Sequence, residues 1–575
     1  MKFDETLLKI GGFGRYQKLL IFSYIIFFPA CSWQSTCLSF LAGDMDHWCK
    51  LDVNGVNKSY LKALVIPKTV DEFGKITYRK CEVYDINITE QAALEGDLAN
   101  LISSTNWTRV PCKYGWEYDK TEFYTTIVSK YNTVCDRAWL QTIPAMAYVL
   151  GLLFGSILAG YISDRWGRKP TAVIMIICQM VCNLGEAFSP YFWLLVGFRF
   201  FVGISNMGAN SAFWILVIEG MSPVYRNHCT CFCQVGSILG FILPVTAYFL
   251  RNHVHLQIVS AVVAVPGLIC AILLPESPRW LLSRKRYKEY ATVVRMIAKI
   301  NSAEFSNEMV PEEGLSEDQK NQAIEGVSFW NLLRTPRLRI RTLILWFIWF
   351  NFNLVLYAFT TNIGKLVPGN IYLNMAIVTA GSELPSLLAM WFALFKTGRR
   401  LALIIYNLIT GLSCLLMIPL IMVNVQFLMT ITAMIAMSAV KTMTQILFLY
   451  TGEIYPTPAR TIGFGSASSI GRIAALIATQ LTLLKKIWFG LPYVMLCIFP
   501  IASGIMAYFL PETKGCHLPE TFEEAEVFGT PEYNNLDKEY IRNGSVELRE
   551  PFISNEALDK TNSISQIQID MSVTS

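Results

Sequence analysis

Three consecutive segments decide the fold class: WLQTIPAMAYVLGLLFGSILAGYI (139–162), SDRWGRKP (163–170) and TAVIMIICQMVCNLGEAFS (171–189). The first and third are apolar runs of about 20 residues, the length that an α-helix needs to cross roughly 30 Å of hydrocarbon. The short segment between them is rich in basic residues. Two apolar runs joined by a basic turn are typical of paired membrane-spanning helices, so the sequence predicts an all-α membrane protein.

The composition of the whole chain agrees with this prediction. Of 575 residues, 53% are hydrophobic and only 16% are charged, which excludes an ordinary water-soluble enzyme. The formal net charge of +5 is too small to indicate a nucleic-acid partner. The lipid bilayer is therefore the expected surrounding of this chain.

Apolar runs predict twelve spanning helices in two groups of six. The spans of the first group lie at 19–42, 139–162, 171–189, 192–217, 231–250 and 256–274. The spans of the second group lie at 341–361, 372–394, 401–422, 427–452, 462–484 and 491–510. The chain thus divides into an N-terminal segment 1–18, a six-helix bundle 19–274, a charged linker 275–340, a second bundle 341–510 and a tail 511–575, which we expect to be disordered.

A polar loop at 43–138 separates the first two spans. It contains three glycosylation sequons, at Asn57, Asn87 and Asn106. It also contains four cysteines, at Cys49, Cys81, Cys112 and Cys135. Sequons and an even number of cysteines favour an oxidising compartment and two disulfides, with three pairings open and free thiols as the alternative.

Short loops predict the orientation, because basic residues stay on the cytoplasmic side. One basic loop follows span two (Arg165, Arg168, Lys169), and another follows span eight (Lys396, Arg399, Arg400). They place both termini in the cytoplasm and the loop 43–138 outside the cell. We therefore expect a multi-pass protein of the plasma membrane.

Several motifs relate the chain to a known family. Residues 160–169, GYISDRWGRK, fit the pattern G-x-x-x-D-R-x-G-R-[KR] of the major facilitator superfamily. Four further motifs occur in order: GFGRYQ (12–17), PESPRWLL (275–282), YTGEIYPT (450–457) and LPET (510–513). Over nearly its full length the chain resembles the organic cation, organic anion and carnitine transporter family. This resemblance implies a carrier of small organic ions whose two bundles rock around a central site.

Charged residues at the predicted cytoplasmic helix ends are expected to form the gate. The salt bridges of such a gate form when the cytoplasmic side closes and break when it opens. The candidates are Asp164, Arg165, Arg168, Glu219, Glu453 and Arg460. The second copy of the loop motif has Phe395 where an aspartate is expected, so its gate should be weaker or differently paired.

Ionisable residues deeper in the spans are candidate functional residues, because burying a charge in the membrane is costly. They are Glu186, Arg199, Glu383, Lys441 and Arg472. In the resembling family the position of Arg472 is acidic in typical cation carriers and Arg in anion carriers and several carnitine carriers. A guanidinium matches a carboxylate, so Arg472 favours an anionic or zwitterionic substrate. The alternative is a structural role, in which Arg472 pairs with Glu383 or with a backbone carbonyl.

Other side chains complete the predicted substrate site. Glu383, beside the helix-breaking Pro385, could hold an ammonium group or simply neutralise Arg472 or Lys441. Gln445 lies one turn after Lys441. Span seven carries a helical stripe of Trp346, Phe350, Asn353 and Tyr357, and span four adds Trp214. Packing is the alternative role for these rings.

The sequence therefore predicts a transporter that leans to carnitine-like zwitterions or organic anions. An organic cation transporter is the alternative, and a non-transporting receptor on the same fold is more remote. A coupling ion, Na⁺ or H⁺, is left open. No cofactor or metal is expected, since Cys229 and Cys233 share a helix face from which Cys231 points away. No span carries a nucleophile and a base at working spacing, so an enzyme is not expected.

Overall fold

The computed structural model describes most of the chain. The described residues are 3–50, 65–70, 76–85, 108–222, 225–304, 330–366, 370–423, 425–456, 459–481, 484, 487–488, 490–514, 519, 522–530 and 533. Among these, eleven helices are long and apolar enough to cross a membrane, and a shorter apolar helix of 17 residues follows them. The predicted all-α fold of twelve spans is confirmed.

The first six spans form the N bundle, which contains two interrupted helices. Its helices are α2 (Arg15–Leu41), α7 (Ile143–Trp166) with the preceding 3₁₀ turn η1 (Cys135–Thr142), α8 (Arg168–Ala187), α9 (Phe192–Glu219), α10 (Arg226–Cys233), η3 (Gln234–Phe241), α11 (Ile242–Leu250), α12 (His253–Val262) and α13 (Ala264–Leu273). Span five is α10, η3 and α11 in succession. A 3₁₀ stretch inside a long helix often marks a hinge or a functional segment.

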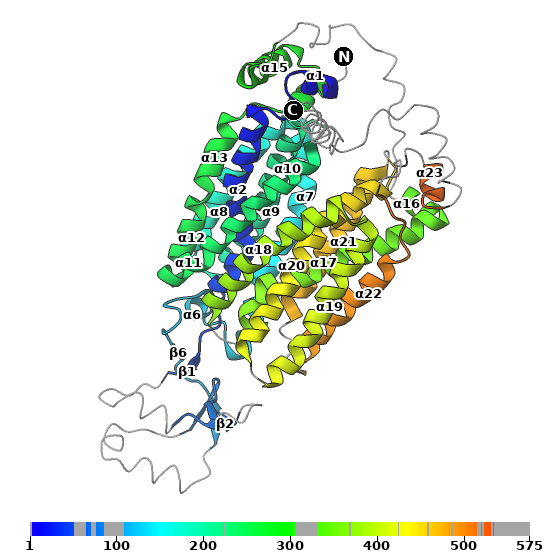
Figure 1. Cartoon of the computed structure of the whole chain (residues 1–575). Helices are drawn as coiled ribbons and strands as arrows, with labels where there is room; N and C mark the ends of the chain where they lie inside the picture. The colour runs from blue at the N-terminus through cyan, green and yellow to red at the C-terminus, as the bar shows by residue number, and fades with distance from the viewer. Residues whose placement is uncertain are drawn as a thin grey trace, which may run out of the picture.

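The last six spans form the C bundle. Its helices are α17 (Pro336–Leu366), α18 (Ile371–Phe395), α19 (Arg399–Val423), α20 (Gln426–Ile454), α21 (Arg460–Gln480) and α22 (Leu491–Ala507). The two bundles lie side by side, as Figure 1 shows. Several spans begin or end a few residues away from the predicted limits; α17, for example, begins five residues before position 341.

Small residues allow the closest helix contacts. A Cβ atom added to Gly151 of α7 would lie 2.2 Å from the carbonyl oxygen of Phe200 in α9. Conversely, a Cβ atom added to Gly203 of α9 would lie 2.3 Å from the carbonyl oxygen of Tyr148. These glycines hold α7 and α9 nearly backbone to backbone, as small residues do in membrane helix pairs.

The two ends of the bundles differ. At one end, here the terminal end, lie the short helices α1 (Phe3–Lys9), α14 (Pro278–Ser283), α15 (Tyr287–Asn301), α16 (Asn331–Arg334) and α23 (Phe522–Val527). Asn301 ties α15 to the start of the chain, since its Oδ1 accepts from Tyr16 N at 2.9 Å and its Nδ2 donates to the Ile10 carbonyl at 2.9 Å.

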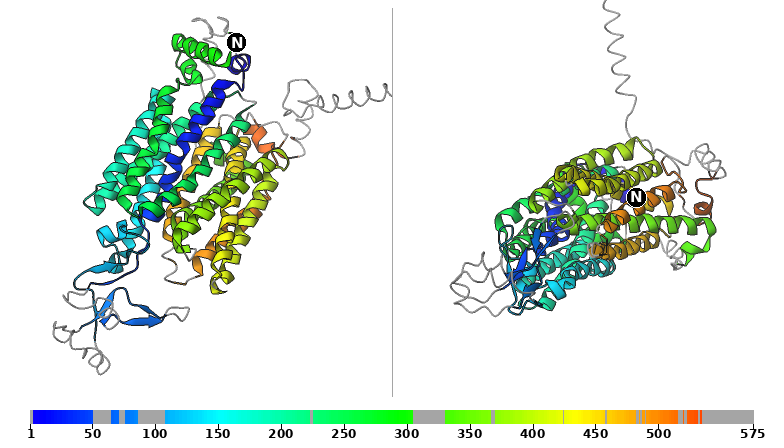
Figure 2. Two further views of the ribbon diagram at one scale, coloured as in Figure 1. Left: turned by 60° about the vertical axis from the view of Figure 1, so that its left-hand side comes forward. Right: turned by 90° about the horizontal axis from the view of Figure 1, so that it is seen from below.

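The other end, here the loop end, carries the residues that follow α2, and Figure 2 shows their strands projecting beyond the helices. The elements are β1 (His47–Cys49), β2 (Lys68–Val70), β3 (Ile76–Tyr78), β4 (Glu82–Tyr84), β5 (Arg109–Pro111), β6 (Trp116–Tyr118) and α6 (Ile127–Tyr131). The strands pair antiparallel as β1 with β6, β2 with β3 and β4 with β5.

Two disulfides cross-link this loop segment, Cys49 to Cys112 and Cys81 to Cys135. The sequence left three pairings open, and the tertiary structure chooses this one. The sequons Asn57, Asn87 and Asn106 lie outside the described residues.

The tail prediction needs a correction, because part of 511–575 is folded. Helix α23 sits against the start of α17, where Glu526 accepts hydrogen bonds from Arg337 N at 2.8 Å and Leu338 N at 3.0 Å. A carboxylate at a helix N-terminus satisfies free N–H groups and interacts favourably with the helix dipole. This short-range cap explains why the segment is ordered despite its polar composition. Positions 534–575 lie outside the described residues.

Candidate functional site

The bundles touch at the loop end through an aromatic group around Tyr372, the second residue of α18. Its ring stacks on Phe40 of α2 with centroids 5.5 Å apart, and its hydroxyl donates to the carbonyl of Glu122 at 2.9 Å. Nearby, Ser39 Oγ donates to the carbonyl of Thr360 at 2.8 Å. The loop end is thus packed shut, apart from a cavity of about 90 Å³ lined in part by Ser39 and Phe123.

Deeper in the interface, span five contacts the C bundle through two polar side chains of η3. Ser237 Oγ donates to Glu383 Oε2 of α18 at 2.5 Å. Gln445 Nε2 of α20 donates to Gln234 Oε1 at 2.9 Å. The 3₁₀ segment therefore brings polar groups to the meeting surface of the two bundles, beside two of the predicted site residues.

Glu383 forms an ion pair with Lys441 of α20, and Lys441 also donates to Ser382 Oγ at 2.8 Å. The side chains are 5% and 16% exposed, so the pair is largely shielded from solvent. Of the two partners that the sequence left open for Glu383, the structure chooses Lys441 and not Arg472. The charge of Lys441 is therefore already balanced.

Arg472, near the middle of α21, points into the interface between the bundles. Its Nη1 donates to the hydroxyl of Tyr357 in α17 at 3.1 Å, and its Nη2 lies 3.5 Å from Met207 Sδ in α9 of the other bundle. Its Nε is buried without a hydrogen-bond partner. Among the described residues no carboxylate lies within ion-pairing distance, so this guanidinium keeps an unbalanced charge.

The backbone around Arg472 is held close to α17. A Cβ atom on Gly471 would lie 2.2 Å from Asn353 Nδ2 and 3.2 Å from the Trp349 carbonyl oxygen, so a larger residue here would require the Asn353 side chain to shift. Asn353 in turn donates to the Trp349 carbonyl at 3.0 Å. The close packing of α21 on α17 places Arg472 beside Tyr357.

The predicted aromatic stripe of span seven makes different contacts along its length. The Phe350 ring packs on Phe499 of α22, with centroids 5.8 Å apart, inside the C bundle. Trp346 donates from Nε1 to Ser466 Oγ of α21 at 3.1 Å. Among the described contacts of these three rings, the one to Arg472 comes from Tyr357, and the roles of Phe350 and Trp346 in the site stay predictions. In the N bundle, Trp214 packs on Tyr24, with centroids 5.2 Å apart.

Three of the four gate candidates of the N bundle, Asp164, Arg168 and Glu219, form one network at the terminal end. Arg168 pairs with Asp164 at 2.7 Å and with Glu219 at 3.2 Å, and Glu219 also accepts from Ser277 Oγ at 2.5 Å. Arg165 donates to the Tyr161 hydroxyl at 3.2 Å. These contacts lie within one bundle, whereas the sequence alone could not say which helices the salt bridges would join.

The C bundle has a related arrangement at the corresponding positions. Arg399 Nε lies 3.6 Å from Glu453, which accepts from Thr513 Oγ1 at 2.5 Å. Arg399 corresponds to Arg168 in the repeated loop motif, and the apolar Phe395 stands in place of Asp164. Arg460, the remaining gate candidate, is the first residue of α21.

Sequence reasoning missed a carboxylate in each network. Glu276 Oε1 accepts from the backbone N–H groups of Arg168 and Lys169 at 3.0 and 3.2 Å. Glu512 accepts from those of Arg399 and Arg400 at 2.7 and 3.2 Å. Burial raises the pKa of the Glu276 carboxyl, whereas the backbone N–H donors of Arg168 and Lys169 act to lower it. The repeated letters PES (275–277) and PET (511–513) were the signal that could have revealed the pair.

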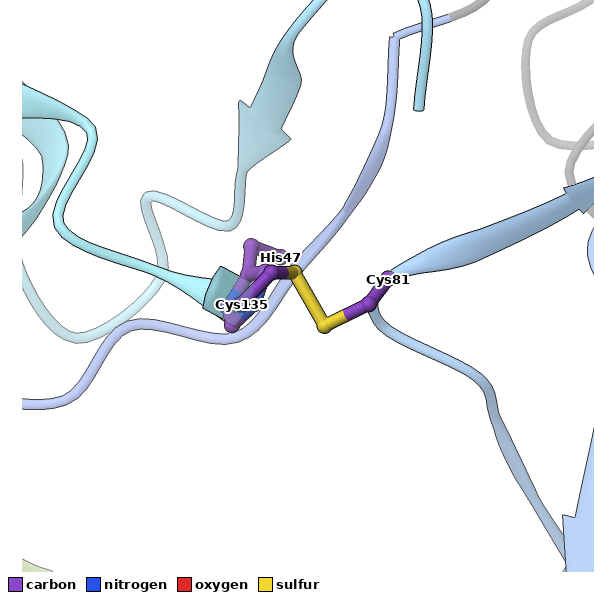
Figure 3. A group of neighbouring side chains, drawn as sticks. All are labelled: His47, Cys81 and Cys135. Atoms are coloured by element: carbon purple, nitrogen blue, oxygen red, sulfur yellow. A yellow bond between two sulfur atoms is a disulfide. The ribbon is translucent and has the colours of Figure 1, made fainter. Parts of the chain in front are cut away.

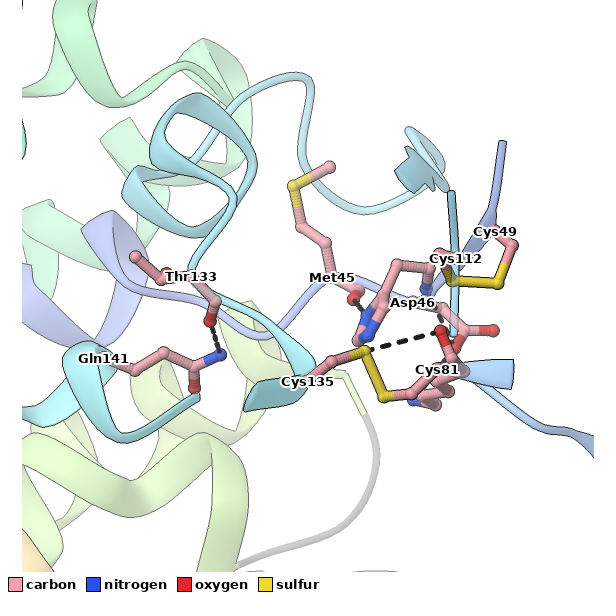
Figure 4. Close-up of a disulfide and its surroundings, with 10 residues drawn as sticks. Met45, Asp46, Cys49, Cys81, Cys112, Thr133, Cys135 and Gln141 are labelled. Carbon is pink, nitrogen blue, oxygen red and sulfur yellow. Dashed lines mark hydrogen bonds and ion pairs between the residues drawn. A yellow bond between two sulfur atoms is a disulfide. The ribbon is translucent and has the colours of Figure 1, made fainter. Parts of the chain in front are cut away.

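Three His and Cys side chains in the loop segment lie as close to one another as the ligands of a metal ion would. Ligand atoms of His47, Cys81 and Cys135 lie within 4.8 Å of one another (Figure 3). The two sulfur atoms are joined to each other, so neither is a thiolate. His47 Nδ1 lies 3.1 Å from the Met45 carbonyl. Figure 4 shows Met45 in the same part of the loop segment as the disulfide between Cys81 and Cys135. This group therefore holds the loop together.

Comparison with known proteins decides the family. Residues 114–525 match the family model described as "Sugar (and other) transporter". The chain belongs to this family. Within the major facilitator superfamily it groups with the organic cation, organic anion and carnitine transporters that its motifs resemble, and it is a transporter, not an enzyme.

Two relatives and one solved structure illustrate this likeness. The carcinine transporter of Drosophila melanogaster is 30% identical over 92% of this chain and 79% of its own length. The β-alanine transporter of the same species is 28% identical over 92% and 89%. The inward-open xylose transporter XylE of E. coli superimposes with a TM-score of 0.58 at 15% identity, over 89% of this chain and 100% of its own, which shows the shared fold.

Proposed function

We propose that this transporter carries small organic ions that bear a carboxylate, either zwitterions of the carnitine kind or organic anions. Arg472, Tyr357, Glu383, Lys441, Gln445 and Trp214 form the substrate site. The terminal end faces the cytoplasm, and the loop 43–138 lies outside the plasma membrane with glycans at its sequons.

The observation that carries this proposal is the unbalanced guanidinium of Arg472. It stands at mid-depth between the bundles, and its contacts are a phenol hydroxyl and a thioether. A charge at this depth is costly unless it is paired or hydrated. A substrate carboxylate would supply the missing partner, and it would do so with two parallel hydrogen bonds that a guanidinium is shaped to form.

The opposite end of a zwitterion has its own acceptor in the C bundle. Glu383 shares its charge between Lys441 and the Ser237 hydroxyl. A substrate ammonium could replace Lys441 at this carboxylate without leaving Glu383 unpaired. The β-alanine transporter, a relative named for an amino carboxylate, supports a substrate with both charges.

The packed loop end supports alternating access. Tyr372 and Ser39 close the interface there, while the salt-bridge networks at the terminal end join helices within each bundle. Rocking would open the Tyr372 contacts and bring the two networks together. This supports a carrier whose present state is closed toward the outside.

Uptake into proteoliposomes tests the substrate class. Radiolabelled β-alanine, carnitine, a dicarboxylate and tetraethylammonium are compared for the wild type, Arg472→Lys and Arg472→Asp. We expect carboxylate uptake to fall in Arg472→Lys, because a lysine ammonium replaces the two parallel donors of the guanidinium with a point charge. We expect it to be lost in Arg472→Asp, because the aspartate repels the substrate carboxylate. Carboxylate uptake that is unchanged in Arg472→Asp would remove Arg472 from the site.

An organic cation is the second candidate, and one observation favours it. Glu383 is an acidic group at the interface, and Trp214 and Tyr357 provide rings that could face a cation. In that case tetraethylammonium would enter in preference to the carboxylates, and Glu383→Gln would abolish its uptake while Arg472→Lys would not.

A further inference from the structure

Two methionines of the N bundle face polar donors of α21 across the interface between the bundles. Arg472 Nη2 lies 3.5 Å from Met207 Sδ of α9, and Gln480 Nε2 donates to Met146 Sδ of α7 at 2.7 Å. Arg472 and Gln480 are eight residues apart, which is about 12 Å along α21. The two sulfur atoms therefore meet α21 at two depths, one at the proposed substrate site and one at the last residue of the helix.

A thioether is a poor partner for these donors. Its sulfur is a weak acceptor without charge, whereas a guanidinium binds oxygen acceptors with a fixed fork of N–H groups. Within the described part of the chain, Arg472 Nε is also buried without a hydrogen-bond partner. The donors of α21 that point to Met207 and Met146 therefore gain little from these contacts, and an oxygen acceptor in the same place would hold them more firmly.

Both methionines are open to a small oxidant. Met207 and Met146 are partly exposed in the present state. Ala145, the chain neighbour of Met146, lines the loop-end cavity of about 90 Å³ together with Thr479, the chain neighbour of Gln480. Hydrogen peroxide is scarcely larger than a water molecule, so a cavity of this size admits it. The oxidant therefore reaches the surroundings of Met146 even while Tyr372 keeps the loop end closed.

Oxidation turns such a sulfur into a strong acceptor. Hydrogen peroxide transfers one oxygen atom to the thioether: an S–O bond forms, the O–O bond breaks and water is released. The sulfur loses two electrons and the peroxide gains them. The product, methionine sulfoxide, carries a polar oxygen, and the three rotatable bonds of the side chain allow this oxygen to turn toward a nearby N–H donor.

We propose that Met207 and Met146 are oxidation sites through which peroxide holds the loop end closed and weakens carboxylate binding; the effect on the substrate rests on the proposed function. The sulfoxide of Met207 accepts from Arg472, so it competes with the substrate carboxylate for the same guanidinium. The sulfoxide of Met146 accepts from Gln480, so it fastens α21 to α7, which pack on each other in the closed state. Both new hydrogen bonds join the N bundle to the C bundle.

The first test needs no substrate. The purified full chain is treated with hydrogen peroxide, and peptide mass spectrometry locates the sulfoxides. Hydrogen exchange of residues 371–375 then reports on the loop end, because Tyr372 joins the bundles there. We expect sulfoxide at Met146 and Met207 and exchange about tenfold slower than before treatment, since a bond to a charged donor favours the closed state by that factor or more. Methionine sulfoxide reductases A and B, which together reduce both epimers, should restore the original rate.

Variants without the sulfur atoms separate this effect from other oxidation. The double variant Met146→Leu with Met207→Leu nearly conserves side-chain volume, and after peroxide it should keep its own untreated exchange rate. The two single variants serve in its place if the double variant does not fold. Met296→Leu is the matched control and should respond as the wild type does, because Met296 is 38% exposed on α15 at the terminal end.

Three results of this experiment would overturn the proposal. They are a wild-type chain without sulfoxide at either position, sulfoxide without slower exchange, and equal slowing in the double variant. None of them depends on which substrate the carrier takes.

The second test measures the effect on the substrate site. Counterflow of labelled β-alanine in proteoliposomes is measured before and after peroxide. We expect KM to rise about tenfold in the wild type and to stay at its own untreated value in Met207→Leu. A rise in Met207→Leu equal to that of the wild type would overturn the role of Met207. Absence of carboxylate counterflow in the untreated wild type would instead overturn the proposed function, and hydrogen exchange would still decide whether the sulfoxides join the bundles.

Discussion

Ser237 Oγ donates a hydrogen bond to Glu383 Oε2 over 2.5 Å, from the 3₁₀ segment of the N bundle to α18 of the C bundle. The same carboxylate is ion-paired with Lys441 inside the C bundle. The Glu383 carboxylate therefore takes part both in the ion pair inside the C bundle and in the contact between the two bundles. A ligand that takes over either contact would change how firmly the two bundles are held together.

Removing this contact should loosen the closed loop end. Because a hydrogen bond to a charged group contributes about 1.5–3 kcal/mol, Ser237→Ala should shift the equilibrium toward the opened loop end by about tenfold or more. The measurement is the maleimide labelling rate at Thr361→Cys, a position lining the loop-end cavity. Thr246→Ala is the matched control, since within the described part of the chain Thr246 Oγ1 donates to the Ile242 carbonyl of its own helix. Equal labelling rates in Ser237→Ala and the parent would contradict this role.

The Lys441 and Glu383 pair should behave as a unit in stability measurements. Lys441→Ala leaves a buried carboxylate without its cation, which we expect to cost about 3–5 kcal/mol of folding free energy. The double variant Lys441→Gln with Glu383→Gln should recover most of that loss, because no buried charge remains. Thermal unfolding of the purified protein, followed by fluorescence, measures both. Additive losses in the double variant would show that the two side chains do not depend on each other.

The two salt-bridge networks at the terminal end should differ in strength. Arg168 has two carboxylate partners, at 2.7 and 3.2 Å, whereas Arg399 lies 3.6 Å from Glu453. We expect Arg168→Gln to reduce both thermal stability and transport rate more than Arg399→Gln does. The difference should be about 1–3 kcal/mol in stability, because the charged hydrogen bond of Arg168 at 2.7 Å is shorter and stronger than the ion pair of Arg399 at 3.6 Å. A larger effect of Arg399→Gln would reverse this ranking.

Docking of α23 should depend on pH. Burial alone would raise the pKa of Glu526, but the N–H groups of Arg337 and Leu338 outweigh it, so the pKa lies below its usual value. A carboxyl with a lowered pKa stabilises the docked state above its unfolded pKa, and this stabilisation is lost as the pH falls through the folded pKa. We therefore expect α23 to become accessible in acid, which hydrogen exchange of residues 522–527 would detect.

Glu526→Gln is the matched variant for this prediction. It should show high exchange at neutral pH and little further change on acidification, because it lacks the titrating group. The neighbouring Glu523→Gln should retain the pH dependence, since the bonds to α17 come from Glu526. Exchange that is independent of pH in the wild-type chain would exclude Glu526 as the cap that responds to acid.

Part of the candidate site was predictable from the sequence and part was not. Arg472 and Glu383 stood out because a charge inside an apolar run is rare and costly. Ser237 and Gln234 did not, because polar uncharged residues in a span are common. Phe350 was predicted to share a wall with Tyr357, and only the tertiary structure shows that its ring packs on Phe499. Glu276 and Glu512 were overlooked as loop residues, although they cap α8 and α19.

The sequence by itself determined the membrane class, the twelve spans and the repeated loop motif, because the thickness of hydrocarbon demands about 20 apolar residues in a row and this is a local property. Only the tertiary structure decided the partners: Lys441 for Glu383, Tyr357 for Arg472, and Cys112 for Cys49. These choices join residues far apart in the chain. They depend on which helix faces meet and at what depth, and this is fixed by the packing of all helices together and not by any single segment.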